Sequence, residues 1–164
     1  MADKYYKFQR IGGYLHKVKT LKDSKGNILE HVVIPMRVEV RPRDILQVIL
    51  GASVLALPLG MTEETWNLGS ELPLFNVLFL AVLGIGFIAM FVYFNYYREV
   101  LEGHKIEMFK RVLMIYFLSL LLVAGFLLLI QKLPWAEEPM VAVKRLLLIT
   151  FPCSMSATIS DVIK

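Results

Sequence analysis

Apolar residues in this 164-residue chain gather in four long runs, while its first 44 residues carry only shorter, partly alternating ones. The long runs occupy residues 45–61, 72–97, 112–130 and 141–163. A helix crosses the hydrocarbon core of a bilayer with about 20 mostly apolar residues and satisfies its backbone polar groups internally. The pattern therefore predicts an all-α membrane domain of four transmembrane helices over residues 44–164.

The preceding segment, residues 1–43, has the pattern of a small β-hairpin. Residues 14–22 and 27–40 are rich in Val, Ile, Leu and Thr, and the D-S-K-G-N stretch at residues 23–27 is typical of a turn. Residues 5–10 could add a further short strand. Because a lone hairpin is marginal in water, we expect it to pack on a neighbour or on a second subunit.

Composition agrees with a membrane protein. Hydrophobic residues make up 57% of the chain and charged residues 20%, with a mean hydropathy of +0.59, whereas soluble domains average about 45–50% and about 25%. The single cysteine, Cys153, excludes a disulfide framework within the chain. The abundance of large apolar residues excludes disorder. A soluble enzyme is disfavoured, and no apolar stretch of the signal-peptide type follows the first charges.

The distribution of basic residues predicts the topology. The first 44 residues hold 10 of the 18 Lys and Arg, and the segment between the second and third runs holds four more. The loop at residues 62–73 has none, and the loop at residues 131–140 has one. Cytoplasmic loops are enriched in Lys and Arg, so we expect a multi-pass protein of the cell membrane with both termini in the cytoplasm.

Four residues on the predicted outer side carry an indole or a cationic side chain. Trp66 and Trp135 fall in the two outer loops and are predicted to anchor the protein at the membrane interface. Lys144 and Arg145 run against the charge bias, because they lie near the outer end of the last run. They could extend outward to water or face an aqueous vestibule.

Polar residues of the last run share one side of the predicted helix. At 3.6 residues per turn, Thr150, Ser154, Thr158 and Asp161 lie within about a quarter-turn of one another. They could line a permeation pathway with Asp161 at its inner mouth and Pro152 as a kink. Alternatively, the hydroxyl groups let helices approach closely and bind their neighbours.

The outer end of the first run also allows two interpretations. Thr62, Glu63 and Glu64 stand where the helix would leave the lipid. Repeated around a symmetric oligomer, the carboxylates would form an acidic ring that concentrates cations. Alternatively, Thr62 caps the start of a short outer helix whose first turn is acidic.

Two motifs resemble those of a family of uncharacterised prokaryotic integral membrane proteins, a domain of unknown function. Residues 58–69 fit the pattern P-L-x-x-T-x-E-x-W-x-L-G, and residues 151–157 are similar to the P-x-S-x-x-A stretch in the last span of that family. Residues 44–53 look like its archaeal branch. The resemblance covers residues 40–164, supports the membrane architecture and implies no particular activity.

Motifs of enzymes and of metal centres are not evident. His16, His31 and His104 have neither cysteine partners nor ligand spacing, so no metal or other cofactor is predicted. No catalytic triad order, H-E-x-x-H motif or glycine-rich phosphate loop occurs, and we expect neither an enzyme nor a nucleic-acid-binding protein.

These observations favour an oligomeric cation channel or permeation pathway, because four spans are few for a path within one chain. The proposed pathway residues are Thr62, Glu63, Glu64, Thr150, Pro152, Ser154, Thr158 and Asp161. The alternative is a structural or accessory membrane protein whose N-terminal segment binds a partner. Solvent access to Ser154 and Thr158 discriminates between them.

Overall fold

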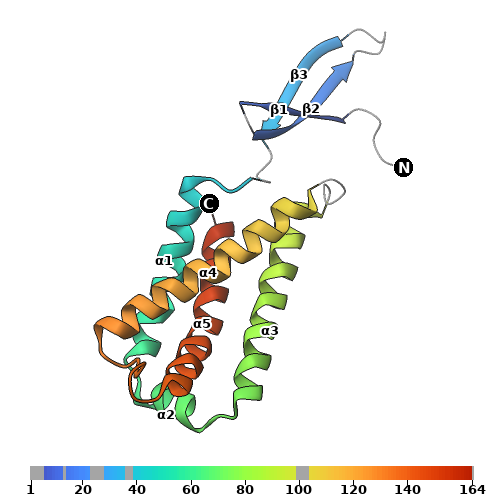
Figure 1. Cartoon of the computed structure of the whole chain (residues 1–164). Coiled ribbons are helices and arrows are strands. Elements are labelled where there is room, and N and C mark those ends of the chain that lie inside the picture. The colour runs from blue at the N-terminus through green and yellow to red at the C-terminus, as the bar shows by residue number, and fades with distance from the viewer. Residues whose placement is uncertain (1–5, 13, 23–27, 36–38, 99–103, 164) are drawn as a thin grey trace. The chain divides into compact units, whose positions relative to one another are not determined.

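The chain folds into two compact units, Met1–Val40 and Arg41–Lys164 (Figure 1). The computed structural model describes residues 6–12, 14–22, 28–35, 39–98 and 104–163. The first unit is a β-sheet and the second is helical.

The β unit contains three strands rather than two. β1 (Tyr6–Ile11), β2 (Tyr14–Lys22) and β3 (Ile28–Pro35) form an antiparallel sheet in the order β1-β2-β3. The predicted hairpin is β2–β3, and β1 is the further strand considered at residues 5–10. The turn predicted at residues 23–27 lies outside the described residues. Gly12, with φ +60°, makes the tight connection from β1 to β2 that favours glycine.

Four helices of the second unit are long and apolar enough to cross a membrane. They are α1 (Pro42–Gly60), α3 (Leu74–Val92) continued by the π-helix η1 (Tyr93–Tyr97), α4 (Lys105–Leu129) and α5 (Pro139–Val162). These confirm the four predicted spans. A short helix, α2 (Glu63–Glu71), joins α1 to α3.

The first span ends close to its predicted bound, because Pro58 lies inside the last turn of α1 and the helix continues to Gly60. The start of the third span differs from the prediction. The helix α4 begins seven residues before the predicted run at residue 112, because its polar first turns, from Lys105 on, continue the same helix beyond the apolar stretch.

Helix α5 occupies the centre of this unit. It packs against α1, α2, α3 and α4, and Figure 1 shows it among them in red. Its contact with α1 is very close, since a Cβ added at Gly51 would lie 2.8 Å from the Cα of Ala157. Hydrogen bonds join the two helices there: the hydroxyl of Ser156 donates to the carbonyl of Gly51 at 2.7 Å, and that of Ser160 to the carbonyl of Gln47 at 2.9 Å. The central position explains why α5 tolerates so many small and polar residues.

Candidate functional site

A buried ionic cluster joins three transmembrane helices. Arg111 of α4 binds Asp161 of α5 through two parallel hydrogen bonds, Nε to Oδ2 at 3.0 Å and Nη2 to Oδ1 at 2.9 Å. The same Nη2 also donates to Oδ2 of Asp44 in α1 at 3.1 Å. All three residues are buried: the exposed fraction is 0% for Arg111, 0% for Asp161 and 1% for Asp44. We call Asp44, Arg111 and Asp161 the ionic cluster.

Each member of the ionic cluster stands near a helix end. Asp44 is in the first turn of α1, where its carboxylate accepts the backbone N–H of Arg41 at 3.1 Å and is favoured by the helix dipole. Asp161 is in the last turn of α5, where the dipole disfavours a negative charge. The guanidinium of Arg111, in the second turn of α4, compensates for that cost.

An aromatic side chain completes the cluster. The Cζ of Arg111 lies 3.9 Å from the ring centroid of Tyr96, and the hydroxyl of Tyr96 donates to the backbone carbonyl of Asp161 at 2.9 Å. Stacking on an aromatic ring and forked binding of a carboxylate are both arrangements that arginine favours over lysine. Tyr96 belongs to η1, and such π-helical turns inside helices are frequent at functional sites.

The predicted permeation stripe is brought together on α5 and faces the interior of the bundle. The hydroxyls of Thr150 and Thr158 donate to the carbonyls four residues earlier, at 2.7 and 2.6 Å, and that of Ser154 donates to the carbonyl of Phe151 at 2.9 Å. The three residues are buried, as is Asp161, and Pro152 lies within the uninterrupted helix. The three hydroxyls and the carboxylate of Asp161 are therefore hydrogen-bonded within the chain.

The predicted outer mouth coincides with the start of α2. Glu63 and Glu64 are exposed in its first turn, as the helix-start interpretation requires. Thr62 stands at the N-cap position, but its hydroxyl turns back to the end of α1 and donates to the carbonyls of Pro58 and Leu59 at 2.8 and 3.1 Å. Thr62 therefore closes α1 rather than capping α2 with its side chain.

Lys144 and Arg145 of α5 donate hydrogen bonds mainly to backbone carbonyls, which the sequence did not predict. The ammonium of Lys144 donates to the carbonyls of Ser70 and Leu72 at 2.8 and 2.9 Å. The guanidinium of Arg145 donates to the carbonyls of Trp66 and Lys132 and to the hydroxyl of Ser70, at 3.0 to 3.2 Å. Cations at a helix C-terminus are favoured by its dipole, so this pair fixes the end of α2 on α5.

The two predicted anchors lie in different surroundings. The indole N–H of Trp66 donates to the carbonyl of Gly60 at 2.8 Å, and the ammonium of Lys132 lies 4.0 Å from the ring centroid. Trp66 therefore also ties α2 to the end of α1. Trp135 is exposed in the connection between α4 and α5, where an interfacial tryptophan can meet the headgroup region.

Metal-binding groups do not converge in the part of the chain that the structure describes. There, no three His, Cys, Asp or Glu side chains are placed to hold one ion. Cys153 is a buried free thiol.

The fold is that of a membrane-embedded protein with four spanning helices, three of them joined by a buried ionic cluster, and a small β unit. Residues 41–163 match the family described as "Putative integral membrane protein (DUF2391)", and the chain belongs to that family. The match covers the helical unit except its last residue and begins after the β unit. No curated protein and no solved structure matches the chain.

Proposed function

We propose that this protein is an accessory membrane protein, in which the helical unit is the anchor and the β unit binds a partner. The observation that carries the proposal is the state of the polar groups on α5. Thr150, Ser154 and Thr158 each donate to a carbonyl of their own helix, and Asp161 is held by Arg111. Groups already bonded and shielded in this way are suited to holding helices together.

The β unit offers a suitable surface for a partner. Among the described strands, β1 and β3 are the two edges of the sheet, and each carries one row of backbone groups that no described strand pairs. Ile11 of β1 and Val33 and Ile34 of β3 are exposed apolar residues. An extended segment added to such an edge gains main-chain hydrogen bonds and side-chain contacts. The surplus of Lys and Arg in the first 44 residues favours an acidic partner.

A photo-crosslinking residue at position 33 tests this role in the full-length protein, in its native membranes. We expect a discrete crosslinked protein product from position 33. Position 121 is the control and should give none, because Leu121 is exposed within the transmembrane part of α4 and would face lipid. Identical product patterns from the two positions would contradict the proposal.

The oligomeric cation pathway predicted from the sequence is a second candidate, favoured by the exposed Glu63 and Glu64. The cation pathway would have to run between chains, because Thr150, Ser154 and Thr158 are buried inside the helical unit of a single chain. Purified protein in liposomes should give no cation flux above empty liposomes if the accessory role is correct. Flux that falls in Glu64→Gln, with Glu71→Gln as the matched control, would instead support the pathway.

Cation flux should also be compared between wild type and Asp161→Asn. This substitution alters the ionic cluster, so its folded state has to be verified by size-exclusion chromatography before flux is compared. A folded Asp161→Asn protein with reduced flux would place Asp161 on the pathway and contradict its purely structural role.

A further inference from the structure

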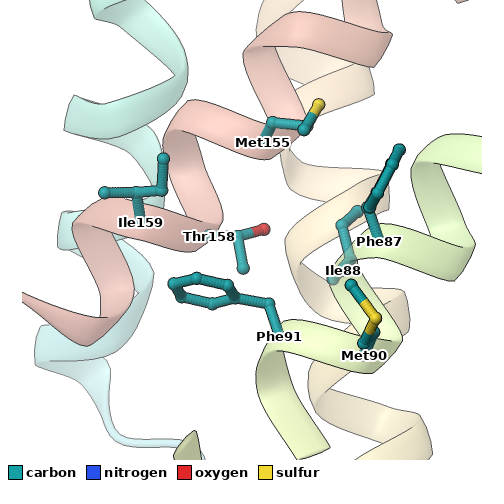
Figure 2. Close-up of a pocket in the computed structure, with 7 residues that line it drawn as sticks. All are labelled: Phe87, Ile88, Met90, Phe91, Met155, Thr158 and Ile159. Atoms are coloured by element: carbon teal, nitrogen blue, oxygen red, sulfur yellow. The ribbon is translucent and has the colours of Figure 1, made fainter. Parts of the chain in front are cut away.

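A small apolar pocket lies between α3 and α5. Its volume is about 140 Å³, and it is lined by Phe87, Ile88, Met90, Phe91, Met155, Thr158 and Ile159. Figure 2 shows the aromatic and methionine side chains of α3 facing Met155, Thr158 and Ile159 of α5 across this space. Several of the lining residues are exposed, including Phe87, Met90 and Ile159, so the pocket opens on the outer surface of the helical unit.

The pocket has the properties of a dry, apolar binding site. Its one polar side chain is Thr158, whose hydroxyl already donates to the carbonyl of Ser154 at 2.6 Å. A water molecule needs two to four polar partners to occupy a cavity, whereas an apolar cavity of about 150 Å³ stays dry and accepts small hydrocarbons. Because both helices are membrane spans, the medium at the opening of the pocket is lipid hydrocarbon.

The pocket also lies at a definite depth. Phe91 precedes Arg98 by seven residues, which is at most about 10 Å along the helix because η1 lies between them. Phe87, Phe91 and Phe94 are spaced by four and three positions, and Arg98 follows Phe94 by slightly less than one turn of the wider π-helix. All four residues are exposed, and together they form one track along α3 and η1. This track leads from the pocket to a cation just beyond the end of the span, where anionic headgroups attract basic side chains.

We propose that the pocket holds part of one acyl chain of an anionic phospholipid whose headgroup lies against Arg98. The hydrocarbon follows the phenylalanine track and fills the space between α3 and α5, so that the side chains of Met90 and Met155 contact the lipid. Methionine side chains are flexible and polarisable, which suits contact with a chain that has no fixed shape. The site would bind a lipid along the side of the bundle, and it does not depend on the function proposed for the β unit.

A photoreactive lipid tests the site in the intact protein. The purified chain is reconstituted in phosphatidylcholine vesicles containing phosphatidylglycerol with a diazirine in its acyl chain, and adducts are mapped by mass spectrometry. We expect adducts to concentrate on the pocket residues of α3 and α5. Arg98→Gln should lower this labelling about fivefold, the change that corresponds to about 1 kcal/mol for one cation at an anionic lipid surface.

A pocket-filling variant provides the second arm. Ile159→Trp should abolish labelling of the pocket, while Val82→Trp, at an exposed position of α3 outside the pocket, should leave it unchanged. Met155→Phe serves as an independent filling variant if Ile159→Trp is not monodisperse. Adducts spread evenly over the exposed apolar residues, equal labelling by a phosphatidylcholine probe, or crosslinks from the pocket to a second copy of the chain would each overturn the proposal.

Discussion

Replacing Arg111 with methionine is expected to destabilise the helical unit by about 3–5 kcal/mol, the usual cost of removing one partner from a buried ion pair. The substitution leaves Asp44 and Asp161 buried at helix ends without the guanidinium that binds both of them. It also removes the group that stacks on Tyr96. The free energy of unfolding can be measured in mixed micelles by denaturant titration, with tryptophan fluorescence as the signal.

Matched variants separate the charge from the shape of the side chain. Lys110→Met removes a neighbouring cation that is exposed, so a change within about 0.5 kcal/mol is expected. Arg111→Lys keeps the charge and loses the forked geometry, and it should give an intermediate value. The triple variant Asp44→Asn, Arg111→Met, Asp161→Asn should recover much of the loss, because no unpaired charge remains buried. Equal stability of Arg111→Met and Lys110→Met would show that the cluster contributes nothing.

The spans and the strands could be predicted from the sequence because their signals are local. A run of about 20 apolar residues identifies a transmembrane helix without knowledge of its neighbours. Alternating apolar residues around a turn sequence identify a hairpin in the same way. The start of α4 was missed because the residues from Lys105 to Arg111 are polar on average, although they continue the helix.

The ionic cluster could not be predicted in this way, because its members are distant in the sequence. Arg111 lies 50 residues from Asp161 and 67 from Asp44, so only the packing of α1, α4 and α5 brings them together. The sequence favours Asp161 as the inner mouth of a pathway, and it places Arg111 in the basic segment between the second and third apolar runs. One signal was available: the predicted topology put all three residues on the same side of the membrane, and ionisable groups within or next to spans usually pair with one another.

The partners of Lys144 and Arg145 also could not be predicted from the sequence. The sequence offered water as the partner of these cations, either outside the membrane or in a vestibule. Their actual partners are mostly backbone carbonyls near the end of α2. Charge patterning indicates that the pair is unusual. A short outer helix is only one of two interpretations of Thr62, Glu63 and Glu64, so the sequence does not assign the C-terminal carbonyls of α2 as acceptors.

Replacing Gly51 with valine is expected to prevent α1 and α5 from packing as they do. A Cβ at this position would lie 2.5 Å from the Cβ of Ser160, 2.8 Å from the Cα of Ala157 and 2.9 Å from the carbonyl oxygen of Ser156. Two of these three atoms belong to the backbone of α5, so rotation of a side chain cannot relieve the contact. The helices must separate, which would also break the hydrogen bond from Ser156 to the carbonyl of Gly51.

The size of the Gly51 effect follows from those two consequences. Overpacking costs about 1–3 kcal/mol, and loss of the hydrogen bond from the part-buried hydroxyl of Ser156 adds about 0.5–1.5 kcal/mol. Gly86→Val is the matched control, because an added Cβ at Gly86 of α3 meets nothing within 4 Å. Gly84→Ala should fall between them, since its added Cβ lies 3.0 Å from the ring of Phe151, which can move. If denaturant titration placed Gly51→Val level with Gly86→Val, α1 and α5 would not approach each other as closely as this packing requires.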